Sequence, residues 1–163
     1  MKISEYPLAA EMLDAIRDYA AEAARVLEID EPEQMAAEGI IEAVNECIEQ
    51  LQKGDGPEFE EDEEAALLLG CLWGQQLVRE LGWQWVGVTF HEFDNAEATG
   101  IVSPNRSLAI YPFHFIFECL ENKAPVTIQL AFEILKEGRR VPRLLPRSYE
   151  NVMDNVQHDT PSQ

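Results

Sequence analysis

The feature that most constrains the fold of this chain is an apolar segment with no polar face, at residues 65–74. In a helix its side chains would be apolar on every side, so that helix must be buried on most of its circumference. Gly70 and Gly74 lie one turn apart, and each disfavours a helix by about 1 kcal/mol relative to alanine. We therefore expect the pair to let another element approach closely. The sequence predicts a core helix over residues 62–81, ended by a left-handed Gly82.

Two amphipathic segments precede the predicted core helix. Apolar residues recur at i, i+3, i+4 and i+7 spacing over residues 8–27 and again over residues 32–53, with charged residues opposite. Asp30 is a candidate N-cap for the second segment, and Glu33 stands at capping-box spacing from it. Two such helices joined by a short turn are expected to pack antiparallel, so that each covers the apolar face of the other.

After the core helix the pattern changes from helical to alternating. Residues 83–92 are rich in aromatic and β-branched side chains, as is typical of a strand. Two further short apolar runs, at residues 101–103 and 107–110, are bounded by turn-forming residues; the stretch 94–100 is expected to be a polar loop. Three short consecutive strands predict an antiparallel meander.

Two short helices are expected to follow the meander. Residues 112–120 alternate aromatic side chains as a strand would, but Pro112 suits the first position of a helix, so a short buried helix is favoured. A last helix is expected over residues 126–137. Prolines then indicate irregular chain, and residues 151–163 are expected to form a disordered tail.

These elements predict a single α+β domain over residues 1–150. It consists of an N-terminal antiparallel helical hairpin (1–56) and a helix-sheet-helix core (57–138), in which the buried helix packs on a small antiparallel sheet, with C-terminal helices. A chain of 163 residues is long enough to bury such a core.

The three cysteines of the chain lie far apart, which argues against a disulfide scaffold. The sequence has neither a signal peptide nor a membrane-spanning run, so a cytoplasmic protein is expected.

The negative charge is concentrated in the first part of the chain. The formal net charge is −19, and residues 1–64 carry 20 acidic and four basic side chains. Such a surface repels nucleic acid and anionic membranes, and it attracts a basic protein over about 8–10 Å. Residues 137–147 are locally basic, and their role stays open. We expect a basic protein partner and no nucleic-acid or membrane partner; solubility alone is the alternative reason for the charge.

Two groups of acidic residues are the candidate partner-binding residues. One group follows a Gly-Pro break, and the other lies along the polar face of the first helix. They are Glu58, Glu60, Glu61 and Asp62, and Glu11, Asp14, Asp18 and Glu22. The first group has a second explanation, because acids in the first turn of a helix are stabilised by its dipole by about 0.3–1 kcal/mol each.

The sequence contains no catalytic motif, so we assign no catalytic residue, no cofactor and no metal site. GxSxG, P-loop, GxGxxG and HExxH patterns are all absent. Whether the protein is an enzyme is open, with a non-enzymatic function favoured. One alternative is an enzyme or metal-binding protein using a cluster at a strand end, namely His91, Glu92 and Asp94. Another is a small-ligand pocket lined by three tryptophans, namely Trp73, Trp83 and Trp85.

Residues 68–85, which read LLGCLWGQQLVRELGWQW, resemble a bacterial family of unknown function, the DUF3806 type. In that family a helix of the form LGxxxGxxL runs into a Gly-Trp-x-Trp-like strand, followed by a strand that carries proline and a short helix. The later counterparts here are residues 101–104 and 111–113. The resemblance covers about residues 60–137; it implies a small α+β domain and carries no catalytic residues to transfer.

The leading functional hypothesis is a non-enzymatic, acidic protein-interaction module of the bacterial cytoplasm. Its acidic front half would steer a basic partner, and an apolar patch would supply the affinity. Architectures related to the family above also occur among bacterial proteins that protect cells from secreted toxins. By that analogy, the more specific hypothesis is an immunity-type inhibitor of a basic toxin.

Overall fold

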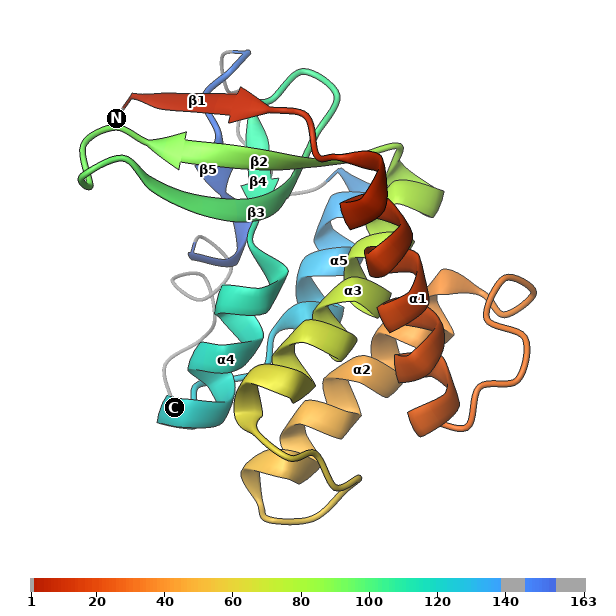
Figure 1. The fold of residues 1–163 in the computed structure, drawn as a ribbon. Helices are drawn as coiled ribbons and strands as arrows, with labels where there is room; N and C mark the ends of the chain where they lie inside the picture. The colour runs from red at the N-terminus through yellow and green to blue at the C-terminus, as the bar shows by residue number, and fades with distance from the viewer. Residues whose placement is uncertain (1, 139–145, 155–163) are drawn as a thin grey trace.

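The computed structural model describes residues 2–138 and 146–154. The elements in chain order are β1 (Ile3–Tyr6), α1 (Ala10–Val26), α2 (Ala37–Gln52), α3 (Asp62–Leu81), β2 (Gln84–Phe90), β3 (Ala96–Val102), β4 (Leu108–Ile110), α4 (Pro112–Asn122), α5 (Ile128–Glu137) and β5 (Glu150–Asn151). The strands form one sheet at one end of a group of helices (Figure 1). The predicted α+β fold is confirmed. No helix in the described ranges is both long enough and apolar enough to cross a membrane.

Within the described residues, the sheet has five strands in the order β1-β2-β3-β4-β5. Strands β2, β3 and β4 form the predicted antiparallel meander, although residues 96–100, expected in a loop, belong to β3. Two strands were not predicted. Strand β1 pairs with β2 from Ile3 opposite Phe90 to Tyr6 opposite Gly87, and β5 pairs parallel with β4, which makes the sheet mixed. Both strands are too short to show a periodic pattern, and only their pairing with a neighbour makes them strands.

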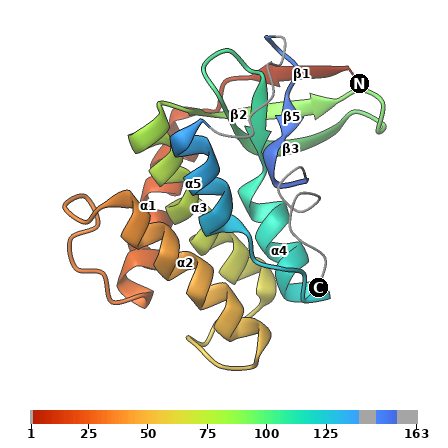
Figure 2. The same cartoon turned by 180° about the vertical axis from the view of Figure 1, so that it is seen from behind.

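Helix α3 is the centre of the helical part, with α1 and α4 on its two sides (Figures 1 and 2). Leu69, Cys71 and Leu77 are fully enclosed, and Trp73 is only 1% exposed. The helix ends at Gly82, whose φ of 68° lies in the left-handed region. The predicted core helix, its bounds and its stop residue are confirmed.

The two glycines of α3 allow aromatic rings to pack against its backbone. A Cβ at Gly70 would lie 2.6 Å from Cδ1 of Phe113, and a Cβ at Gly74 would overlap the ring of Trp85. These two rings stack on one another, with centroids 5.8 Å apart and planes inclined by 13°. The close approach expected from the glycine pair is therefore present, and it joins α3 to β2 and α4.

The first two helices differ from the expected hairpin. Helix α1 packs mainly on α3, whereas α2 packs on α3, α4 and α5. The apolar faces of α1 and α2 are therefore covered mainly by these other helices rather than by each other. Helix α2 also begins at Ala37, five residues later than predicted, and its N-cap residue Ala36 makes no side-chain cap. The reason is a tertiary contact. The guanidinium of Arg79 donates to the backbone carbonyls of Pro32 and Met35 and holds this stretch in a turn.

The C-terminal segment is ordered further than the sequence predicts. Residues expected at the start of a disordered tail include Asn151 in β5 and two buried side chains, Val152 and Met153. These apolar side chains find space in the main core, which no local pattern reveals. Residues 155–163 lie outside the described residues, as do Arg139, Arg140 and Arg143 of the basic stretch.

Candidate functional site

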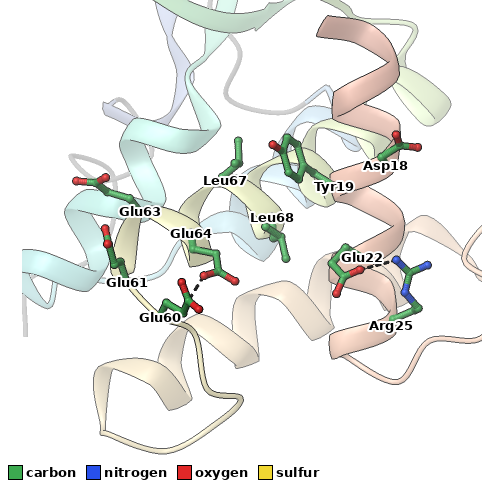
Figure 3. A pocket seen from close by; sticks show the side chains of 10 residues that line it. All are labelled: Asp18, Tyr19, Glu22, Arg25, Glu60, Glu61, Glu63, Glu64, Leu67 and Leu68. Carbon is green, nitrogen blue, oxygen red and sulfur yellow. Dashed lines mark hydrogen bonds and ion pairs between the residues drawn. The ribbon is translucent and has the colours of Figure 1, made fainter. Parts of the chain in front are cut away.

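The acidic groove lies between the C-terminal half of α1 and the start of α3 (Figure 3). Its volume is about 750 Å³. The residues that line it are Asp18, Tyr19, Glu22, Arg25, Glu60, Glu61, Glu63, Glu64, Leu67 and Leu68. Two segments separated by more than 30 positions in the chain thus form one concave surface.

Four of the eight predicted partner-binding acids meet in this groove. Asp18 and Glu22 come from α1, whereas Glu60 and Glu61 come from the segment before α3. The structure adds Glu63 and Glu64, which the prediction did not include. The sequence shows both acidic groups, but it does not show that they face the same groove, because that depends on how α1 packs on α3.

The floor of the groove is apolar. Tyr19 is 39% exposed and projects from α1, while Leu67 is half-buried and Leu68 is buried on α3. Tyrosine combines a large apolar ring with a polar tip, which suits it to a protein interface. The groove therefore combines charged walls with a small surface that a partner side chain would desolvate.

Negative charge in the acidic groove is largely unbalanced. Six of the ten lining residues are acidic and one, Arg25, is basic; Arg25 is paired with Glu22. Asp62, Glu63 and Glu64 occupy the first turn of α3, so the predicted dipole role applies to that turn. Glu64 also accepts a hydrogen bond from the backbone N–H of Glu60 at 3.3 Å. Glu60 and Glu61 precede the helix.

Acidic side chains continue from the groove onto α4. The carboxyl group of Glu121 forms a hydrogen bond with that of Asp62, which raises the pKa of Glu121; the charges of Asp62, Glu63 and Glu118 raise it further. Two carboxyl groups this close favour sharing a proton, because two like charges repel each other. The negative field therefore extends beyond the groove to the C-terminal end of α4.

The other four predicted acids lie elsewhere. Glu11 and Asp14 are in the N-terminal half of α1, outside the groove, and Asp14 forms an ion pair with Arg17. Glu58 and Asp62 line a separate hollow beside the loop before α3. The predicted set is thus divided among several surfaces, of which the acidic groove is one.

The histidine cluster has a structural explanation. Nε2 of His91 lies 2.7 Å from Oγ of Ser4, and Nδ1 lies 3.0 Å from Oδ1 of Asn95. Both ring nitrogens are therefore engaged, and the side chain links β1 to the turn between β2 and β3. In the part of the chain that the structure describes, no three His, Cys, Asp or Glu side chains are grouped so that they could hold a metal ion.

The three tryptophans do not line a common pocket. Trp73 is buried in the core, where it packs edge-on against Phe115 with centroids 5.8 Å apart. Trp83 and Trp85 line a different hollow, between α1, the end of α3 and the start of β2. The indole N–H of Trp85 donates to Oε1 of Gln75 at 3.1 Å.

The cysteines are not available as nucleophiles. All three are buried, and burial raises the pKa of the Cys47 thiol to about 11 and that of Cys71 and Cys119 to about 12. A neighbouring Glu118 adds to the effect at Cys119. At neutral pH these groups are thiols rather than thiolates, which are the reactive form.

A polar cluster around Arg106 was missed by sequence reasoning. Its guanidinium donates to Oε1 of Glu5 on β1 at 3.0 Å and to Oε1 of Gln84 on β2 at 2.9 Å. Arg106 itself has a φ of 61°, and its carbonyl accepts the N–H of Tyr149, the residue before β5. The sequence feature that could have pointed to this cluster is the pair of turn-forming residues Pro104 and Asn105, which precede Arg106. The cluster ties the two terminal strands to the β3–β4 turn.

Comparison of the chain with protein-family models, with curated proteins and with solved structures found no match.

Proposed function

We propose that this protein is a non-enzymatic interaction module that binds a basic protein through the acidic groove. The observation that carries the proposal is the convergence of acids from α1 and from the start of α3 on one concave surface with an apolar floor. Carboxylates with few compensating cations raise the local concentration of a cationic partner and speed its encounter. The apolar floor then provides the contact that slows dissociation.

The narrower form of the proposal is that the basic partner is a bacterial toxin, which the protein inhibits by covering a cationic surface. It is supported by the shape and charge of the groove and by the analogy with bacterial proteins of related architecture that protect cells from secreted toxins. In this form, a cationic side chain of the toxin would enter the groove between Glu22 and Glu60, and its apolar stem would pack on Tyr19.

The test uses two triple variants with the same change in net charge. The groove variant carries Asp18→Asn, Glu60→Gln and Glu61→Gln. The control variant removes three exposed acids on α2 and α5, namely Glu42→Gln, Glu46→Gln and Glu133→Gln. A basic protein captured from the native lysate at low salt and identified by mass spectrometry serves as the partner, and its association rates with the wild type and both variants are measured.

We expect the groove variant to slow association by about tenfold at low ionic strength and to weaken its dependence on salt. The control variant should change the rate much less, because its charges lie away from the groove. Equal effects of the two variants would show that total charge alone attracts the partner. An unchanged rate in both would contradict electrostatic steering altogether.

A further inference from the structure

A second groove runs along α1 and shares no lining residue with the acidic groove. Two adjoining hollows of about 440 and 350 Å³ form it, and Arg17, Gln75 and Val78 line both of them. We call it the tryptophan groove, because Trp83 and Trp85 line one end. Its size lies in the range of sites that hold small organic ligands, which is about 300–1,000 Å³.

The walls of the tryptophan groove are mostly apolar. Leu8 and Leu13, both half-buried, contribute from the segment before α1 and from its start, and the almost fully buried Ile16 and Trp83 also border the groove. Val78 projects from α3 and is 37% exposed, which is unusual for an aliphatic side chain on the central helix of the core. A ligand with an apolar body would remove this surface from water.

The charge of the tryptophan groove differs from that of the rest of the chain. Two arginines, Arg17 and Arg79, and one carboxylate, Glu33, are among its lining residues. Arg79 is held in place by its bonds to the carbonyls of Pro32 and Met35, and its charge is partly balanced by Glu80, whose Oε1 lies 3.5 Å from Nε of Arg79.

Arg17, in contrast, is free to exchange its partner. Its side chain is 63% exposed, and the ion pair that it forms is with an equally exposed Asp14. Exposed pairs of this kind contribute little, typically about 0–1 kcal/mol, so an anionic ligand group can replace Asp14. The planar guanidinium then offers two parallel donors to a carboxylate or sulfonate.

We propose that the tryptophan groove binds a small organic anion with an apolar body. The apolar body lies along Leu8, Leu13 and Val78, beside the edge of Trp83, and the carboxylate or sulfonate head is held by Arg17. This site is independent of the acidic groove and of the protein partner proposed for it.

The probes are anilinonaphthalene sulfonate, whose fluorescence rises on apolar binding, and decanoate as a competitor. We expect Arg17→Gln and Val78→Asp each to weaken probe binding by about fivefold or more, and Arg17→Lys to restore part of the loss. Arg25→Gln, on the other groove of the same helix, is the matched control and should leave binding within about twofold. Decanol, which lacks the anion, should compete far less than decanoate.

Binding that is equal in the wild type, Arg17→Gln and Val78→Asp would overturn the proposal, because the probe would then bind elsewhere. Absence of binding to the wild type, or equal competition by decanol, would also overturn it. A cooperative thermal transition near that of the wild type confirms that each variant is folded. The groove variant used to test partner binding should bind the probe normally, so the two proposals fail independently.

Discussion

Helix α3 has a closed side and an open side. Toward α4 and β2, the stacked rings of Phe113 and Trp85 fill the space above Gly70 and Gly74. On the other side, α3 packs against α1, whose buried residues are mostly small, namely Ala20, Ala23 and Ala24, with Ile16. Alanines bring two helices close together, but they are too short to fill the flanks of the contact.

This contrast explains where binding surfaces arise in this fold. On the closed side, rings packed on glycines leave little room, although Trp85, which covers Gly74, also reaches the edge of the tryptophan groove. The alanine seam leaves a hollow on each flank, one acidic and one lined by tryptophans. The closed side therefore governs stability, and the open side is where ligands have access. Four substitutions are considered in order of decreasing effect, and those at Gly74 and Arg79 test this division directly.

Gly74→Ala should destabilise the protein by about 1–3 kcal/mol, because the new Cβ would overlap the Trp85 ring and force the aromatic stack apart. Urea unfolding measures the loss. Gly39→Ala in α2 is the control, since its Cβ would meet only the flexible end of Met35 and the helix would gain up to about 1 kcal/mol. A stable Gly74→Ala protein would show that the glycines are not needed for packing.

Asn45→Ala should cost about 1–2 kcal/mol. The buried Asn45 side chain accepts the backbone N–H of Gln129 at 3.0 Å and so caps the start of α5 from α2. The free energy of unfolding should fall, and the Gln129 amide should lose protection in hydrogen exchange. Wild-type protection at Gln129 in the variant would argue that another group caps α5.

Arg79→Ala should affect the open side locally, at a cost of about 1 kcal/mol. Loss of its bonds to Pro32 and Met35 should speed hydrogen exchange over residues 30–36 while α4 exchanges as before. If α4 responds equally, the two sides of α3 are not separable in stability.

Glu121→Gln should raise the Tm slightly at pH 7. Because the neighbouring Asp62 raises the pKa of Glu121 in the folded protein, ionised Glu121 disfavours the fold, and this penalty disappears as the pH falls through that pKa. The gain over the wild type should therefore vanish near about pH 4. Glu133→Gln, at an exposed position on α5, serves as the comparison and should show no such gain.

The sequence alone determined the helices, the core and the location of the charge. The apolar run around Gly70 must be buried in any fold, because a helix of that composition has no polar face to present to water. The glycine pair favours a close neighbour, because glycines one turn apart leave the backbone uncovered on one face of the helix. The strand at residues 84–90 and the helix that begins at Pro112 follow from local patterns in the same way.

The tertiary structure decided which of these parts meet. Strands β1 and β5 exist through pairing, α2 starts late because Arg79 binds the preceding turn, and Val152 is buried because the core has space for it. The acidic residues near Glu22 and Glu60 face one groove only because α1 packs on α3. The period of apolar residues in the sequence shows which face of a helix or strand is apolar. Which other element covers that face is decided by contacts between residues far apart in the sequence, and no local pattern contains them.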